Sequence, residues 1–224
     1  MPKKITKRAL ASEKIKYKIL TVAGEMFDRY GYRATTTRQI IEKAGITTGT
    51  LYHFFRDKED ILLHRTKIVY DEAMKAADII ATEIAGEKDD SALRYAIIYA
   101  LEMKAVERYD RVAEHYMESY SSPRITEVML PMNIERNRAF FQKYNPDMTD
   151  EECYIKTLAL RGMRLAFLAE RVYKRKVDYE AKCSFLIETS LAIFNVPANK
   201  ISSIVSKALA LTKEDRFVVQ KFKV

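Results

Sequence analysis

A run of small and polar residues, Thr-Gly-Thr-Leu-Tyr-His at positions 48–53, carries groups that can contact a nucleic acid. Hydroxyl, phenol and imidazole groups hydrogen-bond to phosphate oxygens and base edges, and a glycine lets the backbone approach a partner closely. Upstream, Arg38 offers a planar fork of N–H groups that matches the two acceptors on the major-groove edge of guanine. The candidate DNA-binding residues are Thr36, Thr37, Arg38, Thr47, Thr48, Gly49, Thr50, Tyr52, His53 and Lys58.

Two short helices are predicted to hold these groups. Thr36 can cap the first helix, because its hydroxyl accepts a free amide of the first turn, and Gln39 completes a capping box. Gly45 suits the left-handed residue that ends such a helix, and Thr47 can cap a second helix that begins near residue 48. The residues that would face inwards are Ile40, Ile41, Ala44, Ile46, Leu51, Phe54 and Phe55. The spacing therefore predicts a helix-turn-helix, although similar helix pairs occur in proteins that never touch DNA.

An amphipathic helix is predicted ahead of this pair. Ser12 is expected to cap it and Gly31 to end it. Its apolar stripe would consist of Ile15, Ile19, Val22, Ala23, Met26, Phe27 and Tyr30. Residues 1–12, with Lys3, Lys4, Lys7 and Arg8, are expected to form a mobile basic arm that either follows DNA phosphates or is simply solvated.

With this helix, the run AGITTGTLYHFF at 44–55 and the opening Asp57-Lys58-Glu59 of a further helix, residues 14–63 resemble the tetracycline-repressor (TetR) family of transcriptional regulators. The resemblance implies an all-α chain with an N-terminal three-helix DNA-binding domain and a C-terminal helical domain for effector binding and dimerisation. Three positions depart from the commonest family pattern. Thr48 replaces a frequent lysine, Ile41 a small alanine, and Phe54 a histidine or tyrosine.

Separate roles are expected for the candidate DNA-binding residues. Tyr52 and Lys58 are expected to bind phosphates, through the phenol and through the ammonium group at a helix N-terminus. Base edges would be read from both helices of the motif, with Arg38 the best candidate for a guanine contact. The expected base-reading residues are Thr37, Arg38, Thr48, Gly49, Thr50 and His53.

Composition and charge support a helical chain with a basic N-terminal end. The 224 residues are 48% hydrophobic and 31% charged, with only six glycines and five prolines, and long alternating β patterns are absent. Residues 1–64 hold 13 Lys and Arg against 7 Asp and Glu, a balance of +6 out of the total of +8. A basic face alone is more often solvated or drawn to membranes, but here it coincides with the motif.

The expected domains are 1–64 for DNA binding and 65–224 for effector binding and dimerisation. A long helix from Asp57 to about Gly86 would link them, before a polar break at 86–90. Pro131 is expected to kink or split one of the helices that follow. Those helices are predicted at 91–107, 110–121, 124–144, 149–174, 178–195 and 197–212.

Two of the later helices have apolar faces that need a partner on each side. One side can face the monomer core and the other a second subunit. The family resemblance implies that two such C-terminal helices form a four-helix interface in a homodimer. We assign this role to the helices near 155–173 and 179–195.

The C-terminal region is rich in Tyr and Met, which can line an apolar cavity that contains a few hydrogen-bonding groups. Most residues of these types belong to the core, but family members commonly bind a small-molecule effector here. The candidate ligand-binding residues are Tyr99, Met103, Tyr116, Met117, Tyr120, Met132, Met163 and Phe167.

Several function classes are disfavoured. The sequence shows no apolar run long enough to span a bilayer and no secretory signal, so a cytoplasmic protein is expected. Cys153 and Cys183 have no CxxC spacing and are expected to stay reduced, with a redox-sensing disulfide as the alternative. No metal site and no cofactor are expected, and no nucleophile-and-base arrangement points to an enzyme.

The leading hypothesis is therefore a homodimeric transcriptional regulator, usually a repressor, that binds a palindromic DNA operator and is released by an unknown small-molecule effector. The alternative is a basic helical protein that binds lipid or a protein partner without reading DNA sequence.

Overall fold

The computed structural model describes residues 7–84, 86, 90–170 and 177–213, and every regular element in these residues is helical. The expected all-α fold is confirmed. The elements are α1 (Lys7–Tyr30), α2 (Thr37–Ala44), α3 (Thr48–Phe54), α4 (Lys58–Ile79), the π-helical turn η1 (Ile80–Ile84), α5 (Ser91–Arg108), α6 (Asp110–Ser121), α7 (Pro123–Phe141), the 3-10 turn η2 (Gln142–Tyr144), α8 (Asp150–Ala169), α9 (Tyr179–Ile193) and α10 (Ala198–Leu211).

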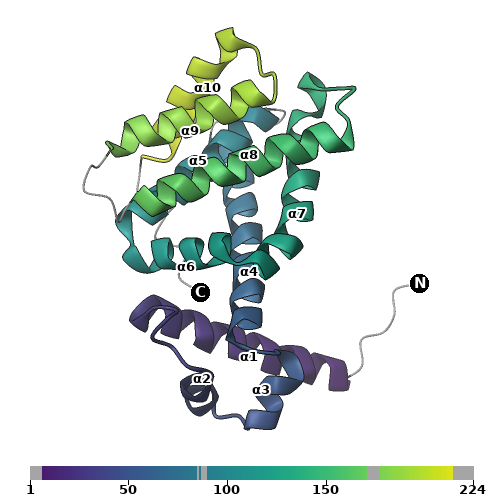
Figure 1. Ribbon diagram of the computed structural model, residues 1–224, viewed down its shortest axis with the longest axis vertical. Coiled ribbons are helices and arrows are strands. Elements are labelled where there is room, and N and C mark those ends of the chain that lie inside the picture. Colours follow the sequence, from purple (N-terminus) through teal and green to yellow (C-terminus); the bar gives the residue numbers. More distant parts are fainter. Residues whose placement is uncertain (1–6, 85, 87–89, 171–176, 214–224) are drawn as a thin grey trace.

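Helix α4 joins two helical bodies (Figure 1). The smaller body at the bottom of the view contains α1, α2 and α3, and the larger one contains α5 to α10. The first half of α4 packs in a small core with Ile19, Phe27 and Leu51, while its second half packs in the larger core around α5. The expected domain boundary at residue 64 thus falls inside a continuous helix.

Side-chain caps set several helix starts. Gln39 N–H donates to the Thr36 hydroxyl and the Gln39 amide oxygen accepts from Thr36 N–H, which confirms the predicted capping box of α2. Thr47 caps α3 and Asp57 caps α4. Gly45 ends α2 at φ 60°, the left-handed conformation that glycine adopts without steric cost.

Ser12 does not cap the first helix. Helix α1 already includes Lys7, so Ser12 lies inside it, and Lys7 and Arg8 belong to the helix and not to an arm. Lys, Ala, Leu and Glu around these positions are strong helix formers, and an exposed helical turn needs no apolar anchor. The rest of the predicted arm, residues 1–6, lies outside the described residues.

The larger body is organised around α5, which is buried on nearly all sides by α4, α7, α9 and α10. Pro131 lies within α7 without splitting it. Ile125 and Met129 in the first turns of α7 reach the core of the smaller body. The helix that follows α6 therefore touches both bodies, and its N-terminus lies beside that of α4.

Candidate nucleic-acid interface and the cavity beside α4

The turn between α2 and α3 presents one face of α3 to solvent. Ile40 and Leu51 are fully buried beneath the motif and fix the crossing of the two helices. On the other side Thr48 and His53 are exposed, and Tyr52 is 51% exposed. Short polar groups on an exposed helix of this kind fit the major groove of DNA.

The remaining candidate residues surround this face. Arg38 and Thr36 are exposed on α2 and at its cap, whereas Thr37 is half-buried. The hydroxyls of Thr47 and Thr50 lie 2.8 Å apart and bond to each other, and Thr47 also accepts from Thr50 N–H. Both hydroxyls therefore already help to hold the start of α3.

Gly49 is exposed on α3, and there is room for a side chain at its position. A Cβ built at this position would lie 3.9 Å from the Thr47 hydroxyl and near nothing else. A glycine inside a helix costs roughly 1 kcal/mol relative to alanine. Since internal packing does not require glycine here, close approach of an outside partner is a physical reason for it.

Lys58 is placed differently from the expectation of a free phosphate-binding cation. Its ammonium donates to the carbonyls of Tyr32 and Thr35, both at 2.8 Å, and lies 4.3 Å from the centre of the Tyr32 ring. Burial lowers the pKa of Lys58, more than the nearby Glu118 raises it. These contacts tie the start of α4 to the loop between α1 and α2.

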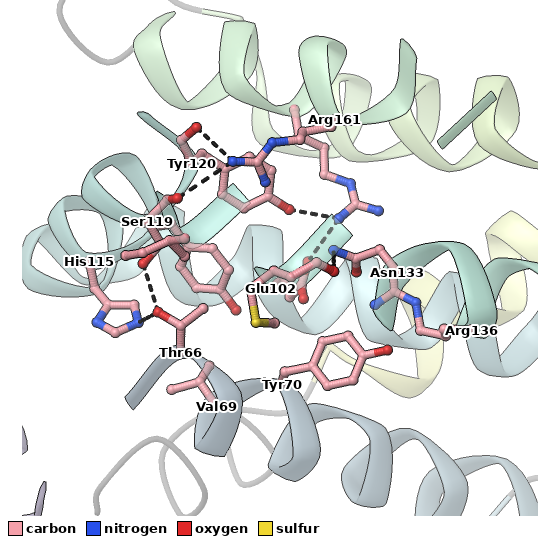
Figure 2. A pocket seen from close by; sticks show the side chains of 14 residues that line it. Thr66, Val69, Tyr70, Glu102, His115, Ser119, Tyr120, Asn133, Arg136 and Arg161 are labelled. Atoms are coloured by element: carbon pink, nitrogen blue, oxygen red, sulfur yellow. Dashed lines mark hydrogen bonds and ion pairs between the residues drawn. The ribbon is translucent and has the colours of Figure 1, made fainter. Parts of the chain in front are cut away.

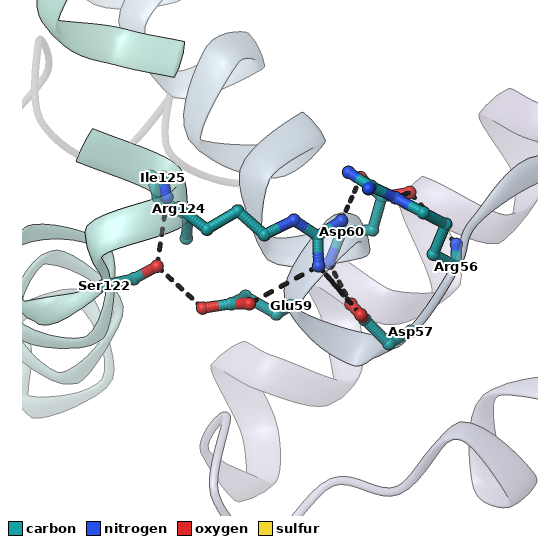
Figure 3. A network of polar contacts seen from close by, with 7 residues as sticks. All are labelled: Arg56, Asp57, Glu59, Asp60, Ser122, Arg124 and Ile125. Atoms are coloured by element: carbon teal, nitrogen blue, oxygen red, sulfur yellow. Dashed lines mark hydrogen bonds and ion pairs between the residues drawn. The ribbon is translucent and has the colours of Figure 1, made fainter. Parts of the chain in front are cut away.

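A charged network joins the start of α4 to the start of α7 (Figure 3). Arg124 contacts Asp57, Glu59 and Asp60, and Glu59 also accepts a 2.6 Å hydrogen bond from Ser122. Burial raises the pKa of the Asp57 carboxyl, but the Asp60 amide and Arg124 outweigh this and leave that pKa below its ordinary value. One arginine thereby holds three carboxylates of the adjoining body.

A second contact joins the smaller body to α6. Arg33 binds Glu118 through its guanidinium at 2.7 Å and donates its backbone N–H to Glu114 at 3.0 Å. Gly31, at φ 90°, lies so close that an added Cβ would be 2.5 Å from the Glu114 carboxylate. The two bodies are therefore joined on both sides of the α4 N-terminus.

A cavity of about 40 Å³ lies between α4, α5, α6, α7 and α8 (Figure 2). Tyr116 and Tyr120 are the two predicted ligand-binding residues that line it. The complete lining consists of Thr66, Val69, Tyr70, Glu102, His115, Tyr116, Ser119, Tyr120, Ile125, Met129, Asn133, Arg136, Arg161 and Arg164.

The other predicted ligand-binding residues are not part of this lining. Tyr99 and Met103 are buried in the larger core, where Tyr99 accepts a hydrogen bond from Arg136. The remaining four are partly buried and pack against core clusters: Met117, Met132, Met163 and Phe167. Most of the Tyr and Met residues therefore fill space between helices.

Four charged side chains that the sequence pattern did not predict as ligand-binding residues also line the cavity: Glu102, Arg136, Arg161 and Arg164. Burial raises the pKa of Glu102 to about 7, although the Arg136 charge acts to lower it. The sequence did contain a signal for these four residues, because each lies at a position where its helix faces the core. Charged groups are seldom buried at such positions without a role.

Thr66 connects the cavity to α4. Its hydroxyl donates to the Leu62 carbonyl, and it also lies 2.8 Å from the Ser119 hydroxyl and 3.3 Å from His115 Nε2. Burial, with a smaller effect of Arg65, lowers the pKa of His115 to about 3, so this imidazole is neutral at physiological pH. A change in the position of α6 at the cavity would thus act directly on α4.

The outer faces of α8 and α9 carry exposed apolar side chains. Ile155 is 57% exposed and Phe185 56% exposed, and Leu158 is also exposed. Ala159 and Gly162 continue the face of α8, and a Cβ added at Gly162 would meet nothing within 4 Å. These are the helices expected to form a dimer interface.

The part of the chain that the structure describes contains no group of three His, Cys, Asp or Glu side chains that could hold a metal ion. None of its helices is long and apolar enough to cross a membrane. Cys153 and Cys183 are free and buried, and burial raises the pKa of the Cys183 thiol to about 12.

Comparison with known proteins agrees with this geometry. Residues 19–64 match the family described as "Bacterial regulatory proteins, tetR family". The transcriptional regulator HbdR of Aromatoleum sp. (strain CIB) is 39% identical over 59 residues, which are 26% of this chain and 26% of that protein. The transcriptional repressor KstR2 of Mycobacterium tuberculosis (strain ATCC 25618 / H37Rv) is 48% identical over 44 residues, which are 20% of this chain and 22% of that protein. The matches thus span about a quarter of these relatives or less.

The fold resembles that of RolR in a crystal structure with its ligand resorcinol. The TM-score is 0.68 at 19% sequence identity, and the alignment covers 89% of this chain and 96% of that chain. At this identity the likeness concerns the fold, which extends over both helical bodies.

Proposed function

We propose that this chain, whose N-terminal domain belongs to the TetR family of bacterial transcriptional regulators, binds a roughly palindromic operator as a homodimer and releases it when a small effector enters the cavity beside α4. The observation that carries this proposal is the exposed face of α3, held on a buried apolar base by caps at both helices of the motif. Repression is the usual action of such regulators.

Operator recognition would divide between the two helices. Arg38, Thr37 and the exposed residues of α3 would read base edges, with Tyr52 bound to phosphate. Gly49 would let the α3 backbone approach the groove closely. Lys58 would act indirectly, because its ammonium holds the loop between α1 and α2.

A homodimer would place two α3 helices on one side of the DNA. The exposed apolar side chains of α8 and α9 suit a four-helix interface with a second copy of the chain. Two half-sites on B-DNA lie about one helical turn apart, roughly 34 to 36 Å, so the dimer must hold its recognition helices near this spacing.

Release would depend on α4. At the cavity, Thr66 contacts Ser119 on α6, and at the DNA end Asp57 contacts Arg124 on α7. An effector that moves α6 and α7 relative to α4 would therefore tilt the smaller body and change the spacing. To shift the population from mostly bound to mostly released, it must favour the released state by several kcal/mol.

Retention of sheared genomic DNA in the presence of excess competitor tests this function. We expect the protein to retain a small set of fragments that share an inverted repeat. Uniform retention of all fragments, lost at moderate salt, would instead support the alternative of a basic helical protein that binds lipid or a protein partner.

A further inference from the structure

We propose that the effector is a small organic acid whose carboxylate lies between Arg136 and Arg164 and whose apolar body extends towards α4. This inference rests on the proposed function, because it gives the chemical class of the ligand for the same cavity. It is carried by the charges of the lining, by two buried guanidinium groups whose Nε atoms have no partner among the described residues, and by the apolar side chains that share the lining with them.

The lining has an excess of positive charge. Among its described residues, Arg136, Arg161 and Arg164 carry three cations, and Glu102 is the single carboxylate. The other polar lining groups are hydroxyls, an amide and the imidazole of His115, which is neutral. Buried charges in proteins are normally paired, so a cavity with two surplus cations favours an anion.

Arg136 is only 6% exposed, and no carboxylate among the described residues forms an ion pair with it, although its charge acts on Glu102 at longer range. It donates from Nη2 to the Tyr99 hydroxyl at 2.6 Å, and its guanidinium lies 5.2 Å from the centre of the Tyr70 ring. Its Nε has no hydrogen-bond partner among the described residues. Phenols and aromatic faces accept N–H groups and attract cations, but they carry no charge.

Arg164 is in a similar position on α8. It is 8% exposed, donates from Nη1 to the Tyr120 hydroxyl at 2.8 Å, and stacks 3.6 Å from the centre of the Tyr99 ring. Glu102 is 3.9 Å away, beyond a normal hydrogen bond, and the Arg164 Nε has no partner in the described part of the chain. A carboxylate could accept from both arginines in a geometry that Glu102 does not reach.

Arg161 contributes charge, but its Nη2 group is already bonded to the protein. It donates to the Tyr120 carbonyl at 2.7 Å and to the Thr126 hydroxyl. The Tyr116 hydroxyl, in contrast, is buried without a partner among the described residues. It can therefore donate to an anion beside Arg164 and Arg136.

The lining also includes apolar side chains. Val69, labelled in Figure 2, comes from α4, and Ile125 and Met129 come from the N-terminal half of α7. The space of about 40 Å³ holds only one or a few water molecules, so the body of an organic acid must push α4 away from α6 and α7. The same displacement would loosen the contacts of Thr66 and Arg124 that link the cavity to the DNA-binding body.

Matched acids and amides test the ligand class on the full-length chain. Benzoate, phenylacetate and hexanoate would be compared with benzamide, phenylacetamide and hexanamide by thermal unfolding and calorimetry. We expect at least one acid to raise the Tm and its amide, of the same shape, to leave it unchanged. Equal shifts for acid and amide in every pair, or no shift with any acid, would overturn the proposal.

Variants of the lining residues test where the carboxylate of the acid binds. Arg136→Met and Arg164→Met should each weaken binding of the acid by about tenfold or more, because each removes a charged hydrogen-bond donor. Above about pH 7, where Glu102 loses its proton, Glu102→Gln should bind the acid more tightly than wild type, since it removes the one repelling carboxylate, and a misfolded variant could not show such a gain. Arg138→Met is the control. Arg138 lies on α7, as Arg136 does, but it pairs with Asp150 away from the cavity, so this variant should leave acid binding unchanged.

Two further measurements, phosphate binding and operator retention, distinguish this proposal from its alternatives. Inorganic phosphate that bound as well as the acids, with the same loss in Arg164→Met, would overturn the organic acid in favour of a simple anion. Operator retention measured with the same samples tests the proposed function by itself. Acid binding without DNA retention would support the ligand class and contradict the proposed regulator function. DNA retention without acid binding would support the regulator function and contradict the ligand class.

Discussion

Arg124 in the first turn of α7 donates from Nη1 to both carboxylate oxygens of Asp57, at 3.0 and 2.8 Å, and Asp57 is the residue that caps α4. The start of the linking helix is thus held by the larger body through its own cap. A movement of α7 at the cavity would therefore act on the start of α4, and through it on the smaller body.

Breaking this contact should separate effector binding from release. In Arg124→Met, three carboxylates lose their shared cation, and because the network is partly exposed the free energy of unfolding should fall by only roughly 0.5 to 1 kcal/mol. Effector affinity should persist, while the loss of operator affinity on adding effector should shrink. Titrations of operator with and without effector measure this. The Arg138→Met variant should behave as wild type in release, and an identical response in Arg124→Met would contradict the linkage.

Lys58→Met should act through stability. The ammonium donates to two backbone carbonyls at 2.8 Å, so its loss should lower the free energy of unfolding by roughly 1 to 2 kcal/mol. Operator affinity should fall at every sequence alike, with an unchanged slope of log affinity against log salt. A slope lower by about one would show that Lys58 binds a phosphate in the complex.

Arg38→Ala should relax recognition at one base pair in each half-site. The guanidinium is exposed beside the α3 face, and a bidentate contact with guanine is worth roughly 1 to 3 kcal/mol. Affinities for operators substituted at each position in turn would reveal the base pair concerned. If Arg38→Ala weakens binding equally for all the substituted operators, Arg38 contacts only a phosphate.

Ala159→Arg should dissociate the proposed dimer without unfolding the monomer. Ala159 is exposed on the apolar face of α8, so an arginine there clashes only with a second subunit. Ala139→Arg, on an exposed position of α7, is the matched control and should remain dimeric. Sedimentation or light scattering gives the mass. A dimer that persists in Ala159→Arg would place the interface elsewhere.

Glu102 should make stability depend on pH. Burial raises its pKa to about 7, against a nearby Arg136 that lowers it, so the folded state keeps a proton that the unfolded state has already lost. Its contribution is complete below the unfolded pKa of about 4.5 and disappears as the pH rises through about 7. The Tm of Glu102→Gln minus that of wild type should therefore grow from about pH 5 to about pH 8. A constant difference would mean that the folded pKa of Glu102 is ordinary.

The sequence by itself determined the helix-turn-helix and most helix limits. Thr36 and Gln39 cap each other's amides, and Gly45 supplies a left-handed residue, all through contacts between residues at most a few positions apart. Such local contacts depend on little else in the chain, so a pattern of residue types is enough to predict them. Ser12 was the exception, because no comparable local contact stops the helix from starting earlier.

Only the tertiary structure decided the composition of the cavity and the contacts of Lys58. Glu102 and Arg164 come from α5 and α8 and meet at a cavity that α4, α6 and α7 also line, and Lys58 finds its carbonyl partners in the loop before α2. Spacing along one helix predicts which side of it is buried, but not which distant helix covers that side. Charges and pKa values in the interior follow from that packing, since they depend on which groups replace water around each side chain.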